Sequence, residues 1–174
     1  MRPVRIGVSL AVCLIVGACS SGPTPVAPTP VTPGSNAGGA RVRVLMLTAT
    51  AGFRHDSIAA ARQVMPGLAA GEFAVDATED LSMISASSLA AYQVIFFALT
   101  SGELELTADQ KTAILTFVAG GGGFIGVHSA TDTLYGWPEY GRLVGAYFNE
   151  HPWTQTATVV VEDQSHPATT GLGE

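Results

Sequence analysis

The chain is short of cysteine and of basic residues. Its two cysteines, Cys13 and Cys19, both lie near the N-terminus, so the region from residue 41 onward cannot use disulfides, thiolate nucleophiles or cysteine metal ligands. Eight Lys and Arg face 14 Asp and Glu, which gives a net charge of −6. Phosphate binding needs clustered basic groups, so nucleic acid is not a predicted partner. A hydrophobic content of 47% with 20 glycines favours a compact α/β fold.

Residues 1–18 have the form of a bacterial secretory signal, with two arginines before the apolar run Ile6–Val16. That run is too short for a comfortable membrane-spanning helix. The residues Val16-Gly17-Ala18-Cys19 resemble the lipobox of bacterial lipoproteins. The resemblance implies cleavage before Cys19 and lipidation of this residue, and an ordinary cleaved signal is the alternative. Because Ser20 and not Asp follows, we expect a lipid anchor on the periplasmic face of the outer membrane if the source is Gram-negative.

The segment that follows, residues 19–40, is rich in proline, threonine and glycine. Such a composition cannot build a core and favours extended polyproline II structure. We interpret it as a spacer that holds the region 41–174 away from the membrane. The length of that region suits a single domain.

Apolar runs and helical patterns alternate along the region 41–174. Strands are predicted at 42–47, 73–78, 93–99, 124–127 and 156–162, with helices at 58–68, 107–119 and 138–144 and a weak helix or turn at 82–91. Thr107 and Gln110 have capping-box spacing, and Pro66 is expected to shorten or bend its helix. The alternation predicts a parallel sheet with helices on both faces. The absence of a closing helix before Glu174 suggests a domain truncated at its C-terminus.

Polar residues follow the fourth predicted strand closely. Four glycines end the preceding helix, and the run Phe124–Val127 then leads to His128, Ser129, Thr131 and Asp132. In an open α/β sheet, ligands bind outside the carboxyl ends of the strands. His55 follows the first strand, and His151 lies in a later loop. We therefore expect a ligand site centred on His128.

Several stretches together resemble the ThuA-like (trehalose-utilisation) family, which is similar in fold to class I glutamine amidotransferases. They are 52–57, 106–132, 148–152 and 165–167. The resemblance implies a three-layer, flavodoxin-like sandwich with a mainly parallel sheet and a link to sugar metabolism. Family domains usually run further, so a last strand and helix are expected to be missing. Amidotransferase relatives carry a nucleophilic cysteine in Gly-x-Cys-x-Gly, where this chain has His128, so amidotransferase activity is not predicted.

Two kinds of chemistry suit these residues. His55, His128 and His151, with Asp132 or Glu150, are able to hold zinc or another divalent metal with one open position. Without a metal, His128 would act as general acid and base, oriented by Asp132 or Glu150. The two carboxylates are also a conceivable glycosidase pair. A Ser129–His128 nucleophile pair is disfavoured, because adjacent residues of a strand point apart.

Aromatic residues cluster after the fourth strand. Tyr135 and Trp137 are candidates for stacking on a sugar ring, and Ser129 and Thr131 for hydrogen bonds to it. The alternative for the aromatics is core packing. The leading hypothesis is an envelope-tethered protein that binds or transforms a carbohydrate, such as a keto sugar or glycoside, as a hydrolase, lyase or isomerase. The alternatives are a non-catalytic sugar-binding or interaction module and a truncated gene product.

Overall fold

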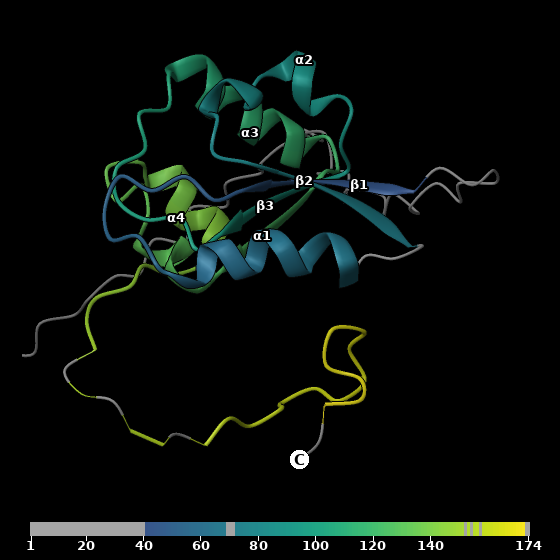
Figure 1. Cartoon of the computed structure of the whole chain (residues 1–174), viewed down its shortest axis with the longest axis vertical. Coiled ribbons are helices and arrows are strands. Elements are labelled where there is room, and N and C mark those ends of the chain that lie inside the picture. The colour runs from purple at the N-terminus through teal and green to yellow at the C-terminus, as the bar shows by residue number, and fades with distance from the viewer. Residues whose placement is uncertain (1–40, 69–71, 152, 154, 157, 173–174) are drawn as a thin grey trace, which may run out of the picture. The chain divides into compact units, whose positions relative to one another are not determined.

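The computed structural model describes residues 41–68, 72–151, 153, 155–156 and 158–172. The predicted signal, lipobox and spacer lie outside these residues. Within them, no helix combines the length and apolar character that crossing a membrane requires. The strands are β1 (Val42–Leu47), β2 (Phe73–Thr78), β3 (Val94–Ala98) and β4 (Gly123–Val127). They form an all-parallel sheet in the order β2-β1-β3-β4 (Figure 1).

The helices are α1 (Ser57–Leu68), α2 (Ala86–Leu89), α3 (Ala108–Ala119) and α4 (Pro138–Val144), with short 3₁₀ turns η1 (Leu81–Met83) and η2 (His128–Asp132). In Figure 1, α1 lies on one side of the sheet, and α2 and α3 lie on the other. This confirms the predicted α/β fold with helices on both faces. It is the arrangement of a flavodoxin-like sandwich.

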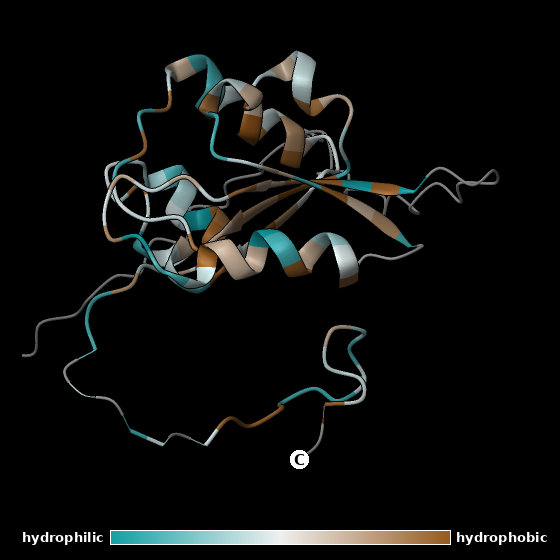
Figure 2. Cartoon of the chain, in the orientation of Figure 1, coloured by the Kyte–Doolittle hydropathy of each residue, from teal (hydrophilic) through white to brown (hydrophobic). Residues whose placement is uncertain are grey.

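The central strands β1 and β3 are buried on both faces, and Figure 2 shows the sheet as largely hydrophobic. Alternate side chains enter two cores. Leu45, Leu47 and Phe97 pack into the core that contains Ile114 of α3. The intervening residues of both strands pack into a second core with Met65 of α1. Strands buried on both sides read as continuous apolar runs, which is why the sequence located them.

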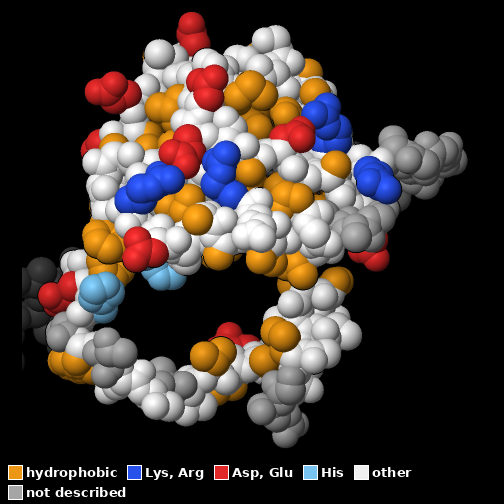
Figure 3. Space-filling view, in the orientation of Figure 1, with side chains coloured by type: hydrophobic (Ala, Val, Ile, Leu, Met, Phe, Trp, Pro, Cys, Tyr) orange, Lys and Arg blue, Asp and Glu red, His pale blue; other side chains and the backbone are white. Residues whose placement is uncertain are grey.

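The face of the sheet that carries α1 is only partly covered. Ile125 and Val127 of β4 are each 45% exposed. They line an apolar groove of about 680 Å³ together with residues of α1 and β3. On the face of the molecule that Figure 3 shows, basic and acidic side chains are interspersed and do not gather into a single basic patch.

The helix boundaries agree with the sequence patterns. The Thr107 hydroxyl accepts from Gln110 N, and the Gln110 side chain accepts from Thr107 N, so the predicted capping box opens α3. An N-cap of this kind contributes about 1 kcal/mol to stability. Pro138 begins α4. Pro66 is accommodated inside the last turn of α1 and does not end the helix at its position.

The strand predicted at 156–162 is wrong. The described residues of this stretch have no regular secondary structure, and Val159 and Val160 are 85% and 74% exposed. β-Branched residues favour a strand only when a neighbouring strand and a packing surface are available. The described residues of this stretch pair with no strand, so the local preference has no effect.

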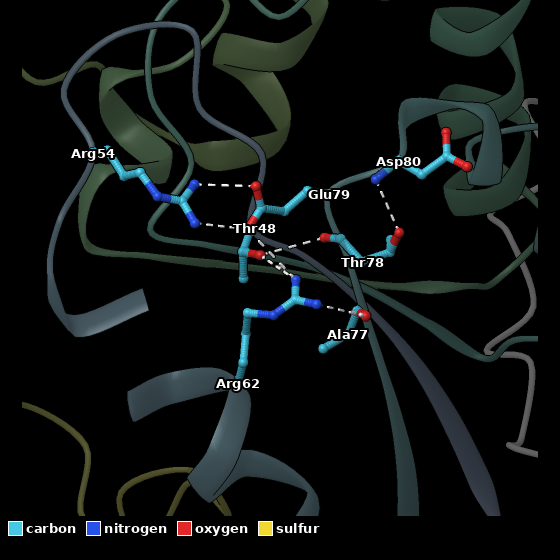
Figure 4. Close-up of polar contacts among 7 residues, drawn as sticks. All are labelled: Thr48, Arg54, Arg62, Ala77, Thr78, Glu79 and Asp80. Atoms are coloured by element: carbon cyan, nitrogen blue, oxygen red, sulfur yellow. Dashed lines mark hydrogen bonds and ion pairs between the residues drawn. The ribbon is translucent and has the colours of Figure 1, made fainter. Parts of the chain in front are cut away.

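A network of ion pairs and hydrogen bonds joins the carboxyl ends of β1 and β2 to α1 (Figure 4). Glu79, just after β2, accepts two hydrogen bonds from Arg54, at 2.8 and 3.1 Å. Arg62 of α1 donates to Thr48 Oγ1 at 2.9 Å and lies 3.8 Å from Glu79. The loop that follows β1 is thereby fixed to the end of the neighbouring strand.

The network predicts a pH dependence of stability. The hydrogen bond from Arg54 lowers the pKa of the Glu79 carboxyl; burial opposes this effect and the charges of Arg54 and Arg62 add to it. The folded pKa is below the unfolded one, so this stabilisation is complete above the ordinary value of about 4.3 and is lost as the pH falls through the folded pKa. Glu79→Gln should therefore lower the free energy of unfolding at pH 6 more than at pH 3, as measured by urea denaturation.

The matched control is Glu105→Gln, a change at an exposed carboxylate for which the described residues show no ion pair. It should have the same small effect at both pH values. A Glu79→Gln effect of equal size at pH 6 and pH 3 would contradict the prediction.

Candidate functional site

A pocket of about 270 Å³ opens at the carboxyl ends of the strands. It brings together residues that follow β1, residues that follow β4 and a later loop. The lining residues are His55, His128, Ser129, Thr131, Asp132, Phe148 and His151. Six of these seven were singled out from the sequence. The convergence follows from the parallel sheet, whose carboxyl ends all lie at one edge.

His128 is the first residue of η2 and makes a sharp turn directly after β4. Its φ is 58°, a left-handed conformation that is uncommon for a residue other than glycine. The turn leaves little room. A Cβ atom at Gly126 would lie 3.1 Å from Val144 Cγ2 and 3.3 Å from Ala130 Cβ. Small residues on both sides of His128 thus allow the turn that places its side chain on the pocket.

His55 lies against His128. The centroids of the two imidazole rings are 4.5 Å apart, at an interplanar angle of 77°. Phe53 packs edge-on against the His55 ring, at 4.8 Å. Ser129 Oγ lies 3.5 Å from His55 Nδ1, so the serine faces His55. This agrees with the sequence argument that Ser129 does not pair with the adjacent His128. Two ionisable rings from different strands therefore share one pocket.

Tyr135 joins Asp132 to the loop that carries Phe148 and His151. Its hydroxyl lies 2.9 Å from Asp132 Oδ1 and 2.7 Å from the Phe148 carbonyl oxygen, so its one proton serves both acceptors. Desolvation, with the hydrogen bond to Asp132, raises the pKa of Tyr135 to about 12. The phenol stays protonated and donating at neutral pH. Phe148 N also donates to Thr131 O at 2.9 Å, which fastens the loop to η2.

The sugar-stacking role predicted for Trp137 does not fit the structure, whereas the role predicted for Tyr135, which is 43% exposed, stays a prediction. The Tyr135 ring stacks on Tyr147 at 4.8 Å, and its hydroxyl is engaged as described. Trp137 is 6% exposed and belongs to the core, with Lys111 Nζ 5.6 Å from its ring centroid. Neither lines the pocket. The core-packing alternative holds for Trp137.

Two further residues differ from expectation. Phe148 is an aromatic side chain that lines the pocket. No pattern in the sequence distinguishes it from the other aromatic residues that follow the fourth strand. Glu150 is exposed and is not among the lining residues, so Asp132 is the only carboxylate that the described residues contribute to the pocket wall.

The predicted metal site is not preformed. Over the part of the chain that the structure describes, no three His, Cys, Asp or Glu side chains come close enough together to hold an ion. His55 and His128 pack edge to face against each other, and His151 contacts Phe148 at 5.2 Å between ring centroids. The three imidazoles share a pocket without forming a ligand set.

Comparisons with known proteins agree with this architecture. The model of the ThuA family, described as trehalose utilisation, matches residues 43–174. The crystal structure of a ThuA-like protein from Bacteroides uniformis superposes with a TM-score of 0.61 at 26% sequence identity. The match covers 81% of this chain and 59% of that one, so this chain spans less than two thirds of its structural relative. No curated protein matches the chain.

The family match takes in β1 to β4, the pocket and the three segments that bear its histidines. It extends over well over half of the sequence, and the structural relative carries the same family description. The chain belongs to the ThuA (trehalose utilisation) family.

Proposed function

We propose that this protein binds a carbohydrate in the pocket at the carboxyl ends of the strands and transforms it by acid–base chemistry. The observation that carries the proposal is the contact between His55 and His128, with 4.5 Å between ring centroids, beside the carboxylate of Asp132. The membership of a trehalose-utilisation family supports a sugar or sugar derivative as the ligand.

The pair of imidazoles supplies both halves of a proton transfer. Imidazole changes charge near neutral pH, so one ring accepts a proton from a sugar hydroxyl, or from the carbon beside a keto group, while the other donates. Asp132 offers an acceptor for sugar hydroxyls, and Tyr135 orients this carboxylate. The chemistry corresponds to a hydrolase, lyase or isomerase acting on a glycoside or keto sugar.

The size of the pocket limits the ligand. Small-molecule sites typically enclose about 300–1,000 Å³. At about 270 Å³ the pocket is slightly smaller than this range, and we expect it to take one sugar ring. The Phe148 ring provides an apolar surface for the face of that ring.

Sugar binding tests the proposal directly. Purified protein is titrated calorimetrically with trehalose, glucose, methyl glucoside and a keto sugar. His55→Asn and His128→Asn should each weaken the binding of the preferred sugar by about tenfold or more, because each removes an imidazole that contacts the ligand. Asparagine is chosen at position 128 because it tolerates the left-handed backbone there.

The matched control is His166→Asn. His166 lies outside the pocket, where its Nδ1 accepts from Ala168 N at 3.1 Å. This variant should bind the sugar as the unmodified protein does. Unchanged affinity in both pocket variants would rule out the histidine pair as the binding site. Weakened binding with no turnover of any sugar would favour the non-catalytic binding module.

A divalent metal held by His55, His128 and His151 is the alternative arrangement. It would require the three rings to converge on one ion, so our leading proposal is metal-free. We expect elemental analysis of the purified protein to find zinc well below one equivalent, and EDTA to leave sugar affinity unchanged. Near-stoichiometric zinc that is lost in His128→Asn would instead support the metal site.

We further propose that the protein is anchored to the cell envelope by lipid on Cys19, with the segment 19–40 as its spacer. The support is the lipobox-like sequence that precedes this cysteine. The full chain, expressed in bacteria fed an alkyne-tagged fatty acid, should carry the label and sediment with membranes. Cys19→Ala should lose the label, whereas Cys13→Ala should lower it little. Label retained in Cys19→Ala would overturn the anchor.

A further inference from the structure

The segment Thr100–Gly102, just after β3, touches two of the three segments that bear the pocket histidines. We name it the β3 clasp. On one side lies the His55 loop, residues 49–56, and on the other lies the His128 turn, residues 128–134. The clasp itself does not line the pocket. Isolated bridges join it to both sides, Thr50 to Ser101 and Gly102 to Thr133.

Toward the His55 loop, Ser101 makes three hydrogen bonds. Its carbonyl oxygen accepts from Ala51 N at 2.7 Å and from Gly52 N at 3.2 Å. Its hydroxyl donates to the Phe53 carbonyl oxygen at 2.5 Å. Ser101 is fully buried, and it holds three groups of a loop whose residues 51–53 are exposed. Since the Phe53 ring packs on His55, Ser101 fixes the backbone from which both rings extend.

Toward the His128 turn, Gly102 and Thr100 make the contacts. Gly102 N donates to Asp132 O at 2.8 Å, and Leu134 N donates to Gly102 O at 3.1 Å. The hydroxyls of Thr100 and Thr133 lie 3.0 Å apart, and Thr133 donates to Ser129 O at 2.9 Å. Because a hydroxyl has a single proton, Thr100 is the donor of the first of these bonds. Both threonines are fully buried.

The clasp and the His55 loop approach so closely that only glycine fits between them. Gly102 has a φ of 75°, and a Cβ there would lie 2.5 Å from Gly52 N. Leu99, just before the clasp, and Leu134, which is bonded to it, have φ of 59° and 56°. Such conformations are unfavourable for residues that carry a side chain, and they persist where the surroundings enforce them. The backbone on both sides of the clasp is therefore held under strain.

We propose that the β3 clasp is a positioning device that sets the contact between His55 and His128, with Ser101 as the positioning residue for His55. Only the expected effect of the clasp on sugar binding rests on the proposed function. The two histidines follow β1 and β4, which are not neighbours in the sheet because β3 lies between them. The segment after β3 therefore connects the two loops whose histidines touch. Removing the Ser101 hydroxyl releases the Phe53 carbonyl and lets the His55 ring move.

Proton NMR of the imidazole signals tests this without any substrate. His55 lies edge-on to two aromatic rings, so its ring protons are displaced by ring currents from the position of an exposed histidine such as His166. The His55 signals are identified by their loss in His55→Asn. Ser101→Ala should move them toward the exposed position and weaken sugar binding by about fivefold.

Thr107→Ala is the matched control. Like Ser101→Ala, it removes a hydroxyl that stabilises the fold, but this hydroxyl caps α3 and is not part of the clasp. It should leave the His55 signals in place. If Ser101→Ala does not fold, Thr100→Val tests the clasp from its other side by moving the His128 signals. Valine keeps the shape of threonine and removes the hydroxyl.

The outcomes separate the clasp from the proposed function. Unmoved His55 signals in Ser101→Ala would overturn the clasp, whatever the sugar affinity. Equal movement in Thr107→Ala would overturn it too, since a general loosening would then explain the result. Signals that move in Ser101→Ala alone support the clasp. If they move while sugar affinity stays unchanged, the clasp stands and the proposed function fails.

Discussion

Burial of the two central strands on both faces is the constraint on which the rest of the structure depends. β1 and β3 fill their space between the helical layers with apolar side chains, which offer no polar groups to a ligand. Polar chemistry is confined to where the strands end. Because all four strands run in parallel, those ends lie at one edge, and the segments after β1, β3 and β4 meet there. The pocket follows from the topology before any of its residues is chosen.

This explains how much the sequence predicts. Continuous apolar runs locate β1, β3 and β4, an alternating pattern locates β2, and the capping box at Thr107 locates the start of α3, since each signal acts locally. The gathering of His55, His128 and Asp132 is long-range, yet it follows from the rule that parallel strands share an edge. Which side chains touch within the pocket does not follow. Ser129 lies nearer to His55 than a strand pattern indicates, because the turn at His128 redirects the chain.

The predictions that failed, and the contacts that were not predicted, depend on interactions between distant parts of the chain. The roles of Trp137 and Phe148 depend on which of two aromatic rings turns toward the core, and local sequence does not specify that. The run around Val159 has the composition of a strand but pairs with none in the described structure. The β3 clasp was not predicted because Ser101 and Gly102 act through backbone groups, through one hydroxyl bonded to a carbonyl far along the chain, and through the absence of a side chain. Such interactions leave no chemical signature in the sequence.

The left-handed backbone at position 128 bears on why a histidine stands there. Glycine adopts that conformation without steric cost, whereas a side chain with a Cβ resists it. For folding alone, glycine would be the more favourable residue, and the neighbouring Gly126 shows that the turn already favours small residues. The imidazole of His128 therefore lowers the stability of the domain. In the proposed function this imidazole takes part in proton transfer, so the turn would trade some stability of the fold for activity.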